Sequence, residues 1–243
     1  VVLLAAGGGF WRLHRPGTAG DEQSPTDAAA VTALNHDAAR PPDARAIAPN
    51  RGNLLANPPV PVVWFPHDEF DTFSAEEHWF QLSSSNISHF AVGRSTGGPQ
   101  TLHMEFSARD WIGYAGVFWG LRDERDPNSK AWKCHTVIVG RSIPSEEFKV
   151  RVQEHIVVPM STGRYALHHS ILLSRSIPVP EGDAVALDVE LTAAGIRQIQ
   201  VDGDTVWTAR GAAEAFAWPS EPGTQFGLTA HAGEFAFHRF SVR

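Results

Sequence analysis

The chain has 243 residues, of which 42% are hydrophobic and 19% are charged, so it holds enough apolar material for a sizeable core. Its net charge of −7 argues against a nucleic-acid partner, because phosphate binding needs a basic surface. The one cysteine, Cys134, excludes an internal disulfide framework and a metal site built from several cysteines.

The first residues form an uncharged apolar run, VVLLAAGGGFW, over residues 1–11. A membrane-spanning helix needs about 20 apolar residues, so this run predicts the end of a truncated transmembrane segment. Phe10 and Trp11 fit the aromatic belt at a membrane interface. A signal-peptide core and a buried first strand are the alternatives.

Residues 12–63 have the composition of a linker. They contain no Phe, Trp or Tyr, and eight of the seventeen prolines fall there. Such a segment cannot bury enough apolar surface to offset its ordering entropy, which predicts a disordered, partly polyproline-like linker. The last piece, residues 58–63, is alternatively an edge strand that leads into a folded domain.

The composition changes at Trp64, and seven of the eight tryptophans lie from there on. Short alternating runs recur about every ten residues without a convincing long helix, which predicts an all-β, two-sheet antiparallel sandwich over residues 64–243. The predicted strands are 87–93, 101–107, 114–121, 132–140, 148–158, 164–173, 184–191, 196–202, 205–209, 225–231 and 234–242.

Three turns carry most of the predicted topology. One hairpin turns at residues 193–195, and a second at Asp202–Gly203, a dipeptide that tolerates the positive φ of a type I′ turn. A third hairpin is predicted at Ala232–Gly233. Its last strand alternates Phe with polar residues, with a slip at His238–Arg239 that predicts a β-bulge.

Three stretches carry a resemblance to a known superfamily: GYAGVFWGLRD, the strand–DG–strand hairpin, and FGLTAHAGEFAFHRFSV. They resemble the concanavalin A-like lectin/glucanase superfamily, with the nearest likeness to laminin-G-like modules and bacterial 3-keto-disaccharide hydrolase-like domains. The resemblance implies a jelly roll. The apolar end, linker and sandwich together also resemble the sensor half of bacterial membrane-anchored Ser/Thr protein kinases, whose kinase would precede Val1.

Strand alternation predicts that four successive strands each present a polar face with a histidine. In the superfamily that the sequence resembles, the concave face of the larger sheet holds sugars. The resemblance therefore implies a ligand-binding groove, with an aromatic ring as a stacking platform. The alternative is an ordinary solvated sheet face. The candidate ligand-binding residues are His103, Glu105, His135, Arg151, Gln153, His155, His169 and Trp119.

Glycoside hydrolysis needs two carboxylates. The glucanases of the superfamily carry them in an E-x-D-x-x-E pattern, and here Asp188-Val189-Glu190 comes nearest but lacks the flanking glutamate. No catalytic residue is therefore predicted. An enzyme of the 3-keto-disaccharide hydrolase-like type, using Glu105 with a histidine partner, remains an alternative.

No cofactor and no metal site are predicted. A metal interpretation would use His103, Glu105, His135 and His155, but no local ligand spacing supports it. A calcium loop of the laminin-G kind, with Asp123, Asp126 and Asn128, is the alternative to a solvated turn. Cys134 falls on a predicted core-facing position, which indicates a buried, inert thiol.

The sequence thus predicts an extracytoplasmic module of a membrane-anchored protein, which binds a carbohydrate or another cell-envelope ligand. The two alternatives are the glycoside-processing hydrolase and a purely structural, protein-interaction sandwich.

Overall fold

The computed structural model describes residues 52–64, 66, 70–76, 79–122, 131–159, 165–211, 216 and 218–243. All of them fall within one unit, Pro41–Arg243. The predicted membrane end (1–11), most of the predicted linker and the candidate calcium loop lie outside these residues. Among the described residues, no helix is long and apolar enough to cross a bilayer.

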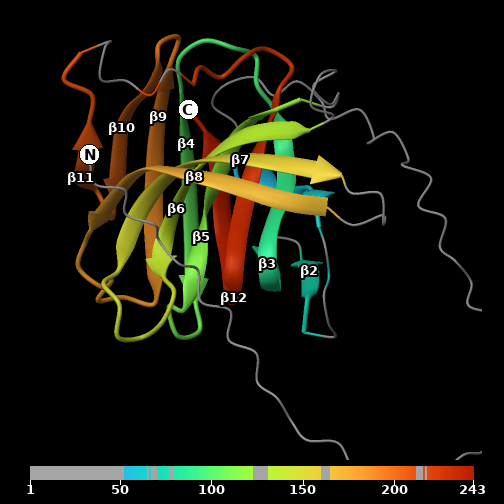
Figure 1. Cartoon of the computed structure of the whole chain (residues 1–243), viewed down its shortest axis with the longest axis vertical. Coiled ribbons are helices and arrows are strands. Elements are labelled where there is room, and N and C mark those ends of the chain that lie inside the picture. Colours follow the sequence, from blue (N-terminus) through green and yellow to red (C-terminus); the bar gives the residue numbers. More distant parts are fainter. Residues whose placement is uncertain are drawn as a thin grey trace, which may run out of the picture. The chain divides into compact units, whose positions relative to one another are not determined.

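Strands make up about two thirds of the described residues, and the only helix among these is one 3-10 turn, which confirms the all-β prediction (Figure 1). The elements are the 3-10 helix η1 (Leu54–Ala56) and the strands β1 (Val60–Val63), β2 (Thr72–Glu76), β3 (Trp79–Arg94), β4 (Gln100–Ala108), β5 (Gly113–Leu121), β6 (Trp132–Arg141), β7 (Lys149–Pro159), β8 (Tyr165–Ser176), β9 (Ala184–Thr192), β10 (Gly195–Val201), β11 (Asp204–Thr208) and β12 (Gln225–Val242).

The strands pair antiparallel in the order β11-β10-β9-β4-β12-β5-β6-β7-β8, and β3 runs beside β12. The first half of β12 pairs with β5, and its second half pairs with β4. Two sheets follow from this switch. The β4 sheet holds β11, β10, β9, β4 and β2, the β6 sheet holds β5, β6, β7, β8 and β1, and β3 and β12 run through both. This arrangement is the predicted jelly-roll sandwich.

The third predicted hairpin is wrong, because residues 225–242 form one continuous strand. Ala232 has a φ of 53°, and the pairing of β12 with β3 shifts between His231 and Gly233. This bulge bends β12 from one sheet into the other, whereas a hairpin would fold the chain back on itself. The bulge predicted at His238–Arg239 is confirmed by a register shift between Phe237 and Arg239. Positive φ values at Asp202 and Gly203 fit the predicted turn between β10 and β11.

The sandwich includes residues before Trp64. Leu54 and Leu55 are part of the core, and β1 pairs with β3. Asn53 ties this segment to β12, since its side-chain amide donates to the carbonyl of His238 and accepts from the backbone N–H of Phe240. Residues 53–63 therefore pack onto the fold, and β1 agrees with the alternative prediction of an edge strand within residues 58–63.

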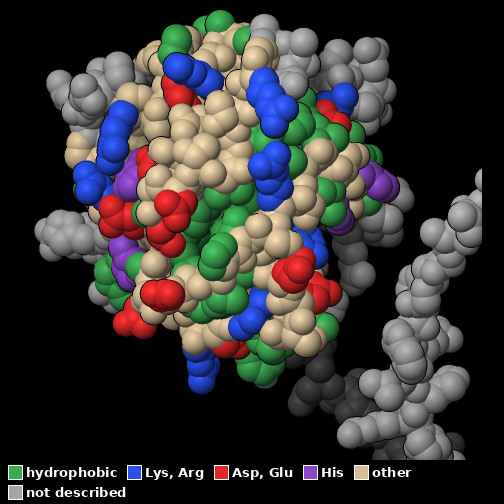
Figure 2. Space-filling view, turned by 90° about the vertical axis from the view of Figure 1, so that its left-hand side faces the viewer, with side chains coloured by type: hydrophobic (Ala, Val, Ile, Leu, Met, Phe, Trp, Pro, Cys, Tyr) green, Lys and Arg blue, Asp and Glu red, His purple; other side chains and the backbone are tan. Residues whose placement is uncertain are grey.

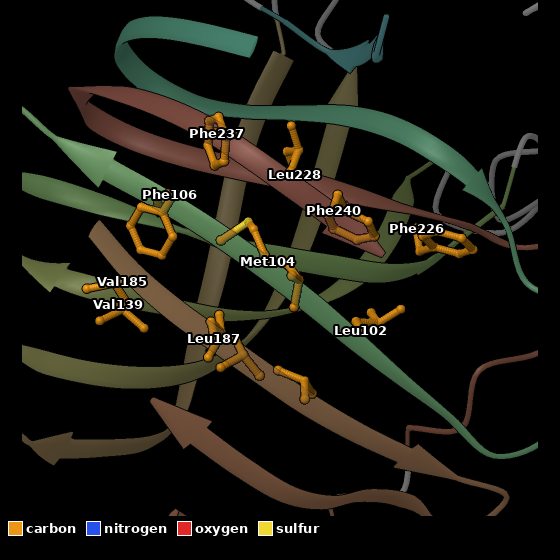
Figure 3. Close-up of a cluster of buried hydrophobic side chains, with 14 of the residues drawn as sticks. Leu102, Met104, Phe106, Val139, Val185, Leu187, Phe226, Leu228, Phe237 and Phe240 are labelled. Carbon is orange, nitrogen blue, oxygen red and sulfur yellow. The ribbon is translucent and has the colours of Figure 1, made fainter. Parts of the chain in front are cut away.

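The core lies between the two sheets. Figure 3 shows side chains of β4, β9 and β12, among them Phe106, Phe237 and Phe240, clustered together with Val139 of β6. The alternation of β4 is as predicted, because Leu102, Met104 and Phe106 are fully buried there. Polar side chains are left for the outer faces. On the face shown in Figure 2, basic and acidic side chains lie interspersed, with no extended basic surface.

Candidate functional site

The β6 sheet is strongly curved. His89 in β3 and His155 in β7 are separated by β12, β5 and β6, which in a flat sheet would place them about 19 Å apart. Their facing ring nitrogens lie 3.2 Å apart. The outer face of this sheet is therefore concave, and in Figure 1 β7 and β8 run across the direction of β4. We use the name concave face for these of its side chains: His89, Tyr114, Phe118, Cys134, Thr136, Arg151, Gln153, His155, His169, Ile171, Thr229 and His231.

At two glycines of this sheet, the backbone of another strand approaches closely. A Cβ on Gly116 would lie 1.9 Å from the carbonyl oxygen of Val137, and a Cβ on Gly227 would lie 2.0 Å from that of Phe90. No side chain fits at either position. The glycines in GYAGVFWG and QFGLT thus permit a strand geometry that any other residue would block.

Among the buried side chains in the deep part of the concave face are His89, Cys134 and His155, which we call the inner cluster. Nε2 of His89 lies 3.2 Å from Nδ1 of His155 and 3.7 Å from Sγ of Cys134. On its far side, Nε2 of His155 lies 2.9 Å from Oε1 of Gln153. Because an amide oxygen only accepts, this nitrogen of His155 carries the proton.

Burial sets the protonation states of the inner cluster. It lowers the pKa of His89 to about 3. It also lowers the pKa of His155 well below its usual value, with repulsion from a charged His89 as the next cause. Burial, followed by the negative charge of Glu154, raises the pKa of the Cys134 thiol. At neutral pH the cluster therefore holds two neutral imidazoles and a thiol.

The outer part of the concave face combines an aromatic ring with cationic and apolar groups. We call it the rim: Tyr114, Arg151, His169, Ile171 and His231. The Arg151 guanidinium lies 4.4 Å from the centre of the Tyr114 ring, and the ring of His231 stacks on that same ring at 6.4 Å. His169 and Ile171 on β8 are exposed. Burial, then the charges of His169 and Arg151, lowers the pKa of His231.

Several polar atoms of the concave face are buried without a hydrogen-bond partner among the described residues. They are Nε of Arg151, the hydroxyl of Thr136 and Nδ1 of His89. Buried polar groups in folded proteins are nearly always paired, so each such atom calls for an explanation. Thr136 and His89 are completely buried, so of the three residues only Arg151 reaches the outer part of the concave face.

The structure divides the eight candidate ligand-binding residues among three places. Arg151, Gln153, His155 and His169 share the concave face, in line with the sequence analysis. His103 and Glu105 lie on the β4 sheet instead. Trp119 and His135 lie on the core side of the β6 sheet, where Trp119 is fully buried and donates to the carbonyl of Trp218. These residues do not line a single groove.

The face predicted for His135 is wrong. The polarity of the strand assigned His135 to the polar face and Cys134 to the core, but the register pairs Cys134 with His155. His135 instead stacks on Trp218, with ring centres 4.0 Å apart. Burial, then the charge of Lys133, lowers the pKa of His135 to about 4. The polar face of β6 is thus the one that carries the thiol.

His103 is the centre of an ion-pair cluster on the β4 sheet. Its Nδ1 lies 2.9 Å from a carboxylate oxygen of Asp188, and its Nε2 lies 3.0 Å from one of Glu105. The bond to Asp188 and then that to Glu105 raise the pKa of His103 against the effect of burial. Arg239 lies 3.7 Å from the same oxygen of Glu105. An imidazolium that donates at both nitrogens has no free lone pair, so it cannot act as a general base.

The residues of the concave face that the sequence patterns did not identify include His89, Tyr114 and His231. His89 lies 45 residues from Cys134 and 66 from His155 along the chain, so no local spacing could have linked them. His231 precedes the bulge that was predicted as a hairpin. The candidate metal ligands His103, Glu105, His135 and His155 do not converge, whereas His89, Cys134 and His155 do.

Comparison with known proteins gives likenesses of fold alone. No protein-family model and no curated protein matches the chain. The carbohydrate-binding module CBM66 from Bacillus subtilis is similar at 14% identity and TM-score 0.46, over 74% of this chain and 99% of that one.

Two further solved structures show the same level of similarity. A Bacillus subtilis protein of unknown function with a galectin-like fold has 12% identity and TM-score 0.42, over 71% of this chain and 85% of its own. A legume lectin-like domain from Entamoeba histolytica has 9% identity and TM-score 0.42, over 71% and 87%. At such values these likenesses carry no argument about function, which rests on the geometry of the concave face.

Proposed function

We propose that this sandwich is a binding module that takes a carbohydrate, or another hydroxyl-rich cell-envelope ligand, at the rim of its concave face. The observation that carries the proposal is the position of Arg151. Its guanidinium lies over the Tyr114 ring, and its buried Nε has no hydrogen-bond partner among the described residues.

The chemistry of the rim suits a sugar. Hydroxyl groups need fixed donors and acceptors, which Arg151, His169 and His231 supply, and the C–H faces of a sugar ring pack on apolar side chains such as Ile171, which is 47% exposed. Arg151 carries a permanent positive charge and forms bidentate bonds with carboxylates. Acidic sugars are therefore expected to bind more tightly than neutral ones.

The setting of the module is also part of the proposal. The apolar run at residues 1–11 and the proline-rich composition that follows it support a membrane-anchored, extracytoplasmic protein. The kinase-sensor context rests on the resemblance alone.

A calorimetric titration with oligosaccharides of neutral, amino and acidic sugars tests the proposal. Binding is expected for at least one acidic oligosaccharide, with affinity reduced at least tenfold in Arg151→Ala. Arg197→Ala is the matched control, because Arg197 is exposed on the β4 sheet and pairs with Glu190. If no sugar binds, or if both variants bind as the unmodified protein does, the rim is not a carbohydrate site.

The hydrolase alternative has weaker support. It needs Glu105 as the reactive carboxylate, and that group already bonds to His103 and lies beside Arg239. Release of the carboxylate would break the ion-pair cluster. Binding without hydrolysis is therefore the expected activity.

A further inference from the structure

The inner cluster has a chemistry that sugar recognition does not use. We propose that His89, Cys134 and His155 form a binding site for one late first-row transition-metal ion, Zn²⁺ or Cu⁺. The three side chains come from β3, β6 and β7, and their donor atoms all lie within 4.8 Å of one another. This inference does not depend on the proposed carbohydrate function.

The spacing of the donor atoms fits a single ion. Zinc binds imidazole nitrogen at about 2.0–2.1 Å and thiolate sulfur at about 2.3 Å, so tetrahedral angles separate two nitrogens by about 3.3 Å and a nitrogen from a sulfur by about 3.6 Å. The corresponding distances are 3.2 Å between the nitrogens of His89 and His155, and 3.7 Å between the nitrogen of His89 and the sulfur of Cys134. The sulfur of Cys134 and Nδ1 of His155 lie within 4.8 Å of each other, so two of the three donor pairs already have the spacing of a bound ion.

The tautomer of His155 is already the one that a metal needs. Gln153 accepts a hydrogen bond from Nε2–H of His155, which leaves a lone pair on Nδ1. That Nδ1 faces His89. Histidine ligands in metal sites commonly donate their second ring N–H to such an acceptor, which fixes the ring and raises its basicity. Gln153 thus supplies the supporting hydrogen bond.

Hydrogen bonds alone leave the inner cluster poorly paired. His89 can donate its one Nε2–H to His155, but Cys134 then has only a 3.7 Å contact to a nitrogen, and a thiol is a weak partner. A metal ion would coordinate all three atoms at once and would convert the thiol to a thiolate. The thiol proton would leave to solvent, and coordination through Nε2 would place the ring proton of His89 on Nδ1, which is buried without a hydrogen-bond partner among the described residues.

Charge and ligand type limit the choice of ion. One thiolate and two neutral imidazoles around Cu⁺ give a net charge of zero, which suits a buried site, and around Zn²⁺ they give +1 with a position left for a fourth ligand. Ca²⁺ and Mg²⁺ prefer oxygen ligands and are not expected to bind. The ion would join three strands that the curvature of the β6 sheet brings together.

Metal binding by the full chain tests the proposal. After chelator treatment, Zn²⁺ or, under anaerobic reducing conditions, Cu⁺ is added to the folded protein and also during refolding, because the cluster is buried. Bound metal is counted after dialysis, and the melting temperature is measured. Co²⁺ serves as a spectroscopic probe, since its thiolate charge-transfer band reports a cysteine ligand.

The unmodified chain is expected to retain one equivalent of Zn²⁺ or Cu⁺ above the Cys134→Ser variant, to melt at a higher temperature with the metal, and to show the Co²⁺–thiolate band. Cys134→Ser is nearly isosteric, and circular dichroism verifies that it folds. His238→Asn, at an exposed histidine, is the control and should behave like the unmodified chain.

Equal metal retention and equal melting shifts in the unmodified chain and Cys134→Ser would overturn the proposal. Arg151→Ala should keep the metal, so a failure of sugar binding and a failure of metal binding can be told apart. If only Cu⁺ or only Zn²⁺ gives these results, that ion is the one that the site binds.

Discussion

Nε2 of His89 lies 3.2 Å from Nδ1 of His155, although three strands of the β6 sheet separate the strands that carry them. This contact exists only because the sheet curls, and the curl places one polar face on the inside of a bend. The same bend buries Cys134 and directs Arg151 and Tyr114 to the rim. Both proposed sites therefore depend on the backbone geometry of the sheet.

Replacing Gly116 should test the close backbone packing on which the curl depends. The Cβ of an alanine at this position would overlap the carbonyl oxygen of Val137, and backbone cannot yield as a flexible side chain can. Gly116→Ala is expected to lower the free energy of unfolding by more than about 2 kcal/mol, measured by urea denaturation. Gly211→Ala is the control, because nothing lies near a Cβ there. Equal stability of both variants would contradict a steric requirement at Gly116.

The ion-pair cluster around His103 should stabilise the fold at low pH more than at high pH. Its carboxylate partners, Asp188 first, raise the pKa of His103 in the folded state. The stabilisation is complete below the unfolded pKa of about 6.5 and is lost as the pH rises through the folded value. Urea unfolding of the unmodified chain and of His103→Gln should therefore differ more at about pH 5.5 than at about pH 9.

A matched substitution separates this effect from a general loss of a histidine. His238 is exposed and hydrogen-bonds Ser107, so His238→Gln should change stability little at either pH. If the free energies of unfolding of the unmodified chain and His103→Gln differ by the same amount at both pH values, the charge of His103 does not contribute to stability.

Asn53 should anchor the segment before β1. Its side chain caps η1 through the N–H of Leu55 and also bonds to the backbone of His238 and Phe240. Asn53→Ala is expected to cost about 1–3 kcal/mol of unfolding free energy, since it removes a cap and leaves backbone groups of β12 unpaired. Asn57→Ala, at the exposed end of η1, should cost much less in the same denaturation experiment. Equal costs would mean that the ties to β12 are unimportant.

Phe237 tests the core between the sheets. Its side chain is fully buried and packs against Phe80 and Phe106. Phe237→Ala is expected to destabilise the fold by about 3–5 kcal/mol through lost burial and the cavity that remains. Ile143→Ala, at a half-exposed loop residue, should stay within about 0.5 kcal/mol in thermal or urea unfolding. A small loss at Phe237 would mean that the core closes over the space.

Much of the fold could be predicted from the sequence, because strands and tight turns are encoded by a few consecutive residues. The alternation of Leu102, Met104 and Phe106 predicts the buried face of β4, and Asp202–Gly203 predicts the turn after β10. Predictions from local sequence patterns were wrong where strands that are distant in the chain determine a residue's conformation. Ala232–Gly233 has the composition of a turn, but β4 and β5 pair with the two halves of the same strand and make it a bulge.

The all-β sandwich and its polar, histidine-bearing strand faces can be predicted from short stretches of sequence, because side-chain periodicity and turn residues act over a few positions. Which of those faces meet depends on contacts between strands that are far apart in the chain. The register of β6 on β7 placed Cys134 rather than His135 beside His155, since a shift of one residue turns every side chain to the opposite face. The curvature of the sheet then brought His89 to both, because a bend adds up over several strands and no short stretch of sequence records it.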